Sequence, residues 1–161
     1  DIDPDDWFYD NVMDAANNGY VSGMGDGTFN PMGATTRAQF ASMIANAMGY
    51  EADPEAPSMF RDVADDFWGK AAINFCVQNG ILTGYEDGSF RGENSILRAE
   101  AAALVNGLLG READMDYVNK NTSSLVTFPD VPPTYWGYGH VMEAANAHEA
   151  DCTGEEEVWA M

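Results

Sequence analysis

The feature that most limits how this chain can fold is an internal repeat, because copies of one small unit must pack against each other to bury their apolar faces. Moving the sequence by 61 positions superimposes Asp1 on Asp62 and aligns the chain with itself, without a gap, as far as Gly110. Many unlike residues coincide: Trp7 with Trp68, Gly23 with Gly84, Asp26-Gly27 with Asp87-Gly88, Phe29 with Phe90, and Arg37-Ala38 with Arg98-Ala99. The sequence therefore predicts two complete copies of one structural unit.

A third copy begins 68 positions after the second and stops halfway. Phe60-x-Asp62-Val63 returns as Phe128-x-Asp130-Val131, and Trp68 returns as Trp136. Residues 138–147 keep the apolar spacing of a first helix, but after His148 there is no glycine-rich loop and no Arg-Ala pair. We expect one compact domain with this order: repeat 1 at 1–50, a linker at 51–59, repeat 2 at 60–110, a linker at 111–127 and a half repeat with a divergent tail at 128–161. Both linkers are polar and are expected to be loops.

Each complete copy has the pattern of a helix, a glycine-rich loop and a second helix. In copy one, Asn18-Gly19 provides a C-terminal stop for the first helix, and the glycines of segment 19–34 favour turns with positive φ. Thr36-Arg37-Ala38-Gln39 then fits a capping box, in which Thr accepts from the third amide and Gln reaches back. Copy two has Leu97 in place of Thr36, and Ser95 lies close enough upstream to provide another cap. The pattern predicts an all-α fold.

The charge of the chain limits its partners. Its formal net charge is -20, from 27 acidic and 7 basic residues. This field repels the phosphates of nucleic acids and anionic membrane surfaces, and it suits a protein outside the cell in a polyanionic wall. No apolar run approaches the roughly 18–20 residues of a membrane-spanning helix. The acidic start of the chain is no secretory signal, and we expect the chain to be a fragment or a trimmed precursor.

Neither a metal site nor a catalytic site is indicated by the residue spacing. His140 and His148 have no His or Cys partner at zinc-ligand spacing, and the segment around Asp26 lacks the alternating oxygen ligands of a calcium loop. No nucleophile motif or phosphate-binding loop occurs, and no pair of carboxylates stands out as catalytic. Cys76 falls on an apolar helix face, which favours a free core thiol over a bridge to Cys152. We expect no enzyme, no metal and no cofactor.

The ordered motifs of both copies resemble the S-layer homology (SLH) repeat. The resemblance covers nearly all of residues 1–110 and, more loosely, 128–147. The motifs that carry it in copy two are Phe60-x-Asp62-Val63, Trp68, Gly80-x-x-x-Gly84, Asp87-Gly88-Ser89-Phe90 and Leu97-Arg98-Ala99-Glu100. Each motif alone is weak, whereas the ordered set occurring twice is specific.

The resemblance implies a fold and a function. Family members usually carry three repeats that form a pseudo-threefold, three-pronged spindle of helices. Grooves between the prongs bind secondary cell-wall polymers, often at a pyruvylated N-acetylmannosamine, and some members bind modified peptidoglycan instead. We therefore expect an extracellular module at the cell surface, in the cell wall or S-layer, that anchors an attached protein without a covalent bond.

When the binding positions of the family are carried over residue by residue, the resemblance implies a set of ligand-binding residues in this chain: Arg37, Arg98, Asp26, Gly27, Asp87, Gly88 and, more weakly, Trp7 and Trp68. Arginine suits a carboxylated sugar because its planar guanidinium binds a carboxylate in bidentate fashion. Exposed amides in a glycine-rich turn also form a concavity that favours anions. The third copy lacks the arginine, so we expect two competent grooves at most.

Each of these residues has a structural alternative. Arg37 and Arg98 would pair with a neighbouring acid, the recurring Trp7, Trp68 and Trp136 would pack between repeats, and Asp26 and Asp87 would form tight turns. The function also has an alternative, a protein assembly module in which the incomplete third copy exposes an apolar seam that self-association buries. Sugar binding that depends on the arginines separates the two functions.

Overall fold

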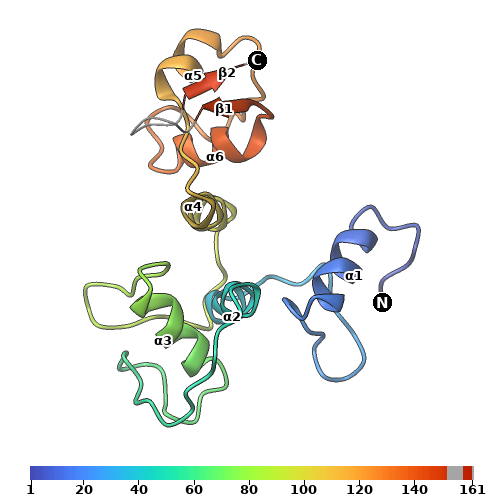
Figure 1. The fold of residues 1–161 in the computed structure, drawn as a ribbon, viewed down its shortest axis with the longest axis vertical. Helices are drawn as coiled ribbons and strands as arrows, with labels where there is room; N and C mark the ends of the chain where they lie inside the picture. Colours follow the sequence, from blue (N-terminus) through green and yellow to red (C-terminus); the bar gives the residue numbers. More distant parts are fainter. Residues whose placement is uncertain (152–157, 161) are drawn as a thin grey trace. The chain divides into compact units, whose positions relative to one another are not determined.

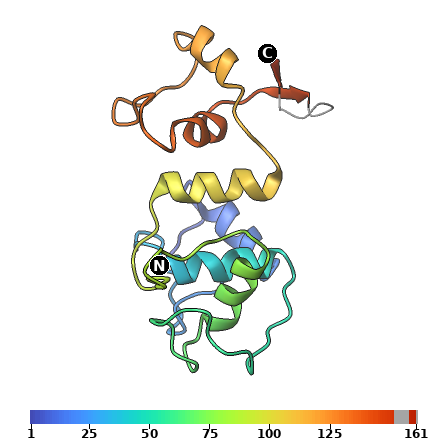
Figure 2. The same cartoon turned by 90° about the vertical axis from the view of Figure 1, so that its left-hand side faces the viewer.

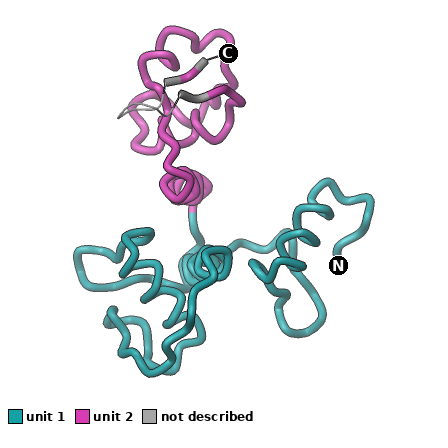
Figure 3. The backbone as a smooth tube through the Cα atoms, viewed as in Figure 1, with its two compact units in different colours: residues 1–96 teal, residues 97–161 magenta. Residues whose placement is uncertain are grey.

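The structure, a computed structural model, describes residues 1–151 and 158–160 and divides the chain into two compact units. Unit 1 spans Asp1–Ile96 and unit 2 spans Leu97–Met161 (Figure 3). The boundary falls inside the second copy, between its glycine-rich loop and its second helix. The repeat limits expected from the sequence, and the three-pronged spindle, stay predictions.

Unit 1 contains α1 (Tyr9–Asn17), α2 (Arg37–Ala47) and α3 (Lys70–Gln78). Helices α2 and α3 pack against each other and lie side by side in two perpendicular views (Figures 1 and 2). Small side chains on α2 permit this close approach, because Ala38, Ala41 and Ala45 are fully buried. The core of unit 1 consists of these alanines together with Ile44, Val63, Ala72, Ile73, Cys76, Leu82 and Phe90.

Cys76 is a free thiol in this core, as the sequence analysis favoured. Its Sγ lies 3.4 Å from the carbonyl oxygen of Ala41 on α2. Burial raises the pKa of the thiol to about 11, so Cys76 is protonated and unreactive at neutral pH. Cys152 lies outside the described residues.

The helix starts confirm one sequence prediction and correct another. Thr36 and Gln39 form the predicted capping box: Gln39 N donates to Thr36 Oγ1 (3.2 Å), and Thr36 N donates to Gln39 Oε1 (2.9 Å). At the start of α4 (Arg98–Leu109), Leu97 has no side-chain acceptor, and only the return bond from Leu97 N to Glu100 Oε2 remains (2.8 Å). Ser95 lies opposite Thr36 in an isolated β-bridge, and no side-chain cap on α4 is seen among the described residues.

Unit 2 contains α4, α5 (Met115–Asn121), α6 (Tyr138–Ala145) and two short antiparallel strands, β1 (Glu149–Asp151) and β2 (Val158–Ala160). The all-α class is confirmed, and α6 is the helix predicted from residue 138 onward. The expectation of a loop over the whole linker 111–127 is wrong, because α5 lies within it. Asp114 caps α5 by accepting from Tyr117 N (2.8 Å), and Val118 is fully buried.

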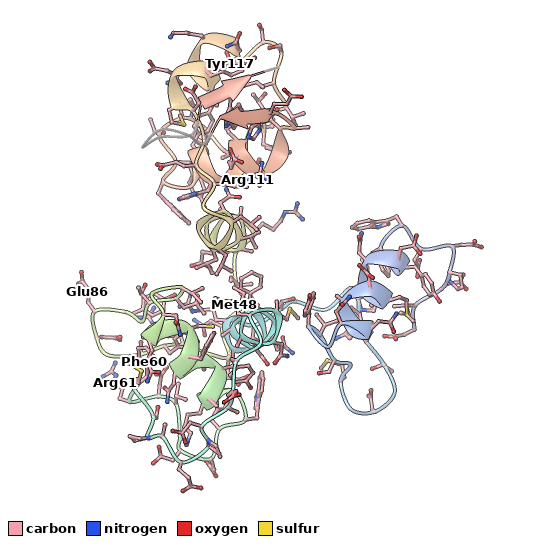
Figure 4. All side chains as sticks on the ribbon, viewed as in Figure 1. Met48, Phe60, Arg61, Glu86, Arg111 and Tyr117 are labelled. Atoms are coloured by element: carbon pink, nitrogen blue, oxygen red, sulfur yellow. The ribbon has the colours of Figure 1, made fainter. Side chains whose placement is uncertain are left out.

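The half repeat in unit 2 is completed by its strand pair. Trp159 on β2 is buried, and its indole N–H donates to Oε2 of the buried Glu143 (3.1 Å). The other carboxylate oxygen of Glu143 lies 2.6 Å from Nη2 of Arg111, which Figure 4 labels. His148 stacks on Trp159, with ring centroids 3.9 Å apart. These contacts tie the strands to α6 where a complete copy would continue into its loop.

The described residues contain neither a membrane-spanning helix nor a cluster of metal ligands. No helix in this part of the chain is long and apolar enough to cross a membrane. In the same residues, no group of three or more His, Cys, Asp or Glu side chains is placed to hold a metal ion.

Candidate functional site

The first aspartate of each copy fastens the glycine-rich loop of that copy. Asp62 accepts from the backbone N–H groups of residues 90 and 91, both at 2.8 Å, and Asp1 accepts from those of residues 29 and 30, at 2.9 and 2.6 Å. In each pair the second residue, Asn30 or Arg91, has a positive φ, which costs energy outside glycine. Burial raises the pKa of Asp62, but the two amide donors outweigh it and leave that pKa below its ordinary value.

A glycine lets each loop close on itself. Met24 N donates to the carbonyl oxygen of Thr28, and Tyr85 N donates to that of Ser89, both at 2.8 Å. A Cβ on Gly23 would lie 2.5 Å from the Thr28 oxygen, and one on Gly84 would lie 2.9 Å from the Ser89 oxygen. The glycines preceding these donors therefore have a steric reason to recur 61 positions apart.

Asp26 and Asp87 form tight turns, as the structural alternative predicted. Oδ1 of Asp26 accepts from both the N–H and the hydroxyl of Thr28 (3.0 and 2.7 Å), and Oδ1 of Asp87 accepts from the same groups of Ser89 (3.0 and 2.6 Å). The following glycines, Gly27 and Gly88, have φ of 92° and 78°. A role of these four residues in ligand binding stays a prediction.

The two turns differ in the charged groups that surround their aspartates. Oδ2 of Asp87 lies 2.8 Å from Nη2 of Arg61, which Figure 4 labels, and 3.4 Å from Nη2 of Arg91. The pKa of Asp87 is lowered to about 2, chiefly by the Ser89 hydroxyl and amide, with Arg61 and Arg91 adding to the effect. The Thr28 hydroxyl and amide lower the pKa of Asp26 as well.

Arg37 crosses from the first copy to the loop of the second. Its Nε donates to the carbonyl oxygen of Phe90 and its Nη2 to that of Thr83, both at 3.1 Å. The guanidinium carbon lies 4.9 Å from the ring centroid of Phe90 and 5.2 Å from that of Tyr85. Arg37 is only 7% exposed. These contacts give Arg37 a structural role in closing the second loop, and a ligand contact of Arg37 stays a prediction.

Arg98 occupies the equivalent position in the second copy and is exposed at the start of α4. The half repeat contains no glycine-rich loop with carbonyl groups like those that receive Arg37. A ligand contact of Arg98 stays a prediction.

The three recurring tryptophans lie at the surface. Their exposed fractions are 87% for Trp7, 61% for Trp68 and 59% for Trp136, so the interpretation that they are core residues packed between repeats is wrong. Each contacts the aromatic ring that precedes or follows it in the chain, with centroids 5.4–5.5 Å apart: Phe8, Phe67 and Tyr135. Their free faces are available to a ligand.

Unit 1 contains a groove of about 490 Å³ between the first loop, α2 and part of the second copy. The first loop contributes much of segment 20–36, and the second copy contributes Trp68 and Glu93. Among the predicted ligand-binding residues of unit 1, Trp68 is the one that lines this groove. Helix α2 contributes Gln39, Ser42, Met43 and Asn46.

Three polar side chains of α2 were missed by the sequence analysis. Gln39, Ser42 and Asn46 recur at helical spacing, so they lie along one face of α2, which they present to the groove. Oε1 of Gln39 accepts from Thr36 N, which leaves its NH₂ group as a donor. Nδ2 of Asn46 donates to Tyr20 O (3.4 Å), which leaves Oδ1 as an acceptor. The sequence signal that could have identified these residues is their helical spacing, which forms a polar stripe next to the apolar stripe of the same helix.

Comparison with known proteins gives a consistent result. The family model described as "S-layer homology domain" matches residues 1–41 and 60–102, which together make up just over half of the chain. The chain is 30% identical over 152 residues to "Cell surface glycoprotein 1" and 31% identical over 140 residues to "Cellulosome-anchoring protein", both from Acetivibrio thermocellus. It is 31% identical over 105 residues to "Surface-layer 125 kDa protein" from Lysinibacillus sphaericus.

These matches cover most of this chain but only part of each relative. They span 89%, 83% and 65% of the chain, against 6%, 30% and 9% of the respective relatives. The chain therefore spans less than a third of the length of each of these relatives.

Proposed function

Because this chain belongs to the S-layer homology domain family, we propose that it anchors the protein of which it is part to the cell wall, by binding a wall polysaccharide in the groove of unit 1. The observation that carries the proposal is the groove itself, which combines an exposed tryptophan with a stripe of polar side chains. The matches to surface and anchoring proteins support a location at the cell surface.

The groove has the composition that a sugar requires. A pyranose ring has an apolar face of C–H groups, which suits the 61% exposed Trp68, and a rim of hydroxyl groups that need hydrogen-bond partners. Gln39, Ser42 and Asn46, which line the same groove, offer neutral donors and acceptors. The volume of about 490 Å³ lies within the range of about 300–1,000 Å³ that is usual for ligand pockets.

The proposal assigns the second loop a supporting role. Arg37 is a positioning residue here: by donating to Thr83 O and Phe90 O it fixes the second loop beside α2. No catalytic step is part of the proposal, in keeping with the expectation that the chain is not an enzyme. A secondary cell-wall polymer or a modified peptidoglycan is the proposed partner, and self-association stays a prediction.

The test is binding to purified cell walls, measured by co-sedimentation with walls of several bacteria, including Acetivibrio thermocellus and Lysinibacillus sphaericus. We expect Trp68→Ala to weaken binding about tenfold, or about 1.4 kcal/mol. Trp7→Ala is the matched control, because Trp7 occupies the equivalent position and is exposed but does not line the groove. It should leave binding within about twofold, since Trp7 makes no contact with the groove to which the proposal assigns the polysaccharide. The proposal fails if wild type binds none of the walls, or if both variants lose binding equally.

A further inference from the structure

The charges that face the groove of unit 1 restrict the kind of sugar it can take. Among the described residues that line it, none is Arg, Lys or His, and the one charged side chain is the exposed carboxylate of Glu93. The rest of the lining is neutral and includes Trp68 and the polar stripe of α2, Gln39, Ser42 and Asn46. The lining therefore contains no cation to balance an anionic ligand.

Each basic side chain of unit 1 is held in contacts away from the groove. Arg37 donates to Thr83 O and Phe90 O, and Arg61 and Arg91 pair with Asp87. Lys70 is 5% exposed, and its Nζ donates to the carbonyl oxygen of Pro54 (2.9 Å). Bringing Arg37 or Lys70 to a sugar would break buried hydrogen bonds, which are costly to leave unmade.

Electrostatic repulsion from the acidic residues also disfavours an anionic sugar. A carboxylate about 4–5 Å from Glu93 would be repelled enough to weaken binding about fivefold, even at the dielectric constant of water. The net charge of -20 adds repulsion at longer range, which salt screens beyond about 10 Å at 0.1 M.

From this lining we infer that the groove binds an uncharged sugar, one with hydroxyl or N-acyl groups and no carboxylate. The free groups match this chemistry, because the NH₂ of Gln39, the hydroxyl of Ser42 and Oδ1 of Asn46 are all neutral. The inference rests on the proposed function and narrows its ligand. It departs from the pyruvylated N-acetylmannosamine implied by the resemblance, which carries a carboxylate.

The test uses wall polysaccharide purified from a wall that retains the protein and shown by NMR to carry pyruvyl ketals. Its affinity for the full chain is measured by calorimetry before and after mild acid hydrolysis removes the ketals. We expect binding to persist after removal and to become about fivefold tighter at 20 mM salt. This gain should shrink in 0.5 M salt, where charges are screened. Loss of binding on removal overturns the inference and leaves the proposed function standing, whereas failure to bind any wall is failure of the proposed function.

A variant locates the effect in the groove. Glu93→Gln removes the one charge of the lining, so it should tighten binding to the ketal-bearing polymer severalfold and leave binding to the ketal-free polymer within about twofold. Glu86→Gln is the control, because Glu86 is an exposed glutamate on the second loop, outside the groove (Figure 4). It makes the same change in net charge and should alter neither affinity. Equal responses of the two variants contradict the inference.

Discussion

The two glycine-rich loops of unit 1 share one turn, yet they lie in different surroundings. In both, an aspartate binds the following Thr or Ser, and the first aspartate of the copy holds two amides. Phe90 of the second loop is nevertheless fully buried, whereas Phe29 of the first is partly exposed and lines the groove. The motif determines the local turn, and the neighbour that packs on the loop decides whether it becomes core or binding surface.

The two equivalent arginines show the same dependence on a neighbour. Arg37 is buried because the loop of the following copy offers it two carbonyl groups. Arg98 is exposed, and the copy that follows it has no such loop. One residue type at one position of the motif is therefore a structural cation in one copy and a surface residue in the next.

The largest difference between the loops should appear when their phenylalanines are truncated. Phe90→Ala should lower the free energy of unfolding of unit 1 by about 3–5 kcal/mol, because it leaves a cavity in the core. Phe29→Ala should cost about 1 kcal/mol, because its ring is already partly hydrated. Urea unfolding followed by circular dichroism measures both variants, and equal losses would contradict the comparison.

The second-largest difference in stability is expected between the variants of the two equivalent arginines. Arg37→Ala should destabilise unit 1 by about 2–4 kcal/mol, because it leaves the carbonyl groups of Thr83 and Phe90 without their donor. Arg98→Ala should change stability by less than about 0.5 kcal/mol. Hydrogen exchange of the second loop sharpens the test: protection of amides 83–91 should fall in the first variant only. A large loss of stability in Arg98→Ala would break the contrast.

A smaller effect is expected at the helix starts. Leu97→Thr should stabilise α4 by about 1 kcal/mol, because it restores the half of the capping box that Thr36 provides in α2. Thr36→Leu should destabilise α2 by a similar amount. Thermal unfolding of the two variants gives the comparison, and a lower melting temperature for Leu97→Thr would show that Leu97 has another role.

The smallest difference between the two loops is expected in how their aspartates, Asp87 and Asp26, make stability depend on pH. The pKa of Asp87 is about 2 against an ordinary 3.8, so its charge stabilises the folded state above about pH 4 and this contribution is lost as the pH falls toward 2. Asp87→Asn should therefore lower the melting temperature near neutral pH and make its decline between pH 4 and 2 shallower. Asp26→Asn should have the same sign and a smaller size, because no arginine is seen to pair with Asp26 among the described residues. Melting curves from pH 2 to 6 decide this, and identical curves for both variants would refute the ranking.

The helical elements were largely predictable because their signals are local. Helix α2 and its capping box follow from four consecutive residues, Thr36 to Gln39, whose interactions span one turn. Helix α5 was missed because the residues around it are polar, and its stability depends on the burial of Val118 within unit 2. Ser95 was expected to offer a cap, but it pairs through its backbone with Thr36, 59 positions earlier in the chain, and such a long-range pairing leaves no local signal.

The site was less predictable than the fold. Trp68 was identified as a candidate and does line the groove, but Gln39, Ser42 and Asn46 were not identified. Spacing alone shows that these three residues share a helix face, without showing whether that face meets solvent, core or a groove.

The sequence by itself predicted the helices of the two copies, the first helix of the half repeat and the tight turns at Asp26 and Asp87, because these features depend mainly on interactions within a few residues. Tertiary structure alone decided the rest. It buried Arg37 against the carbonyl groups of a loop 46 to 53 residues away, and it exposed Trp68 at the groove. The physical reason is that burial and charge pairing depend on which surfaces meet in space, and identical motifs in successive copies meet different ones.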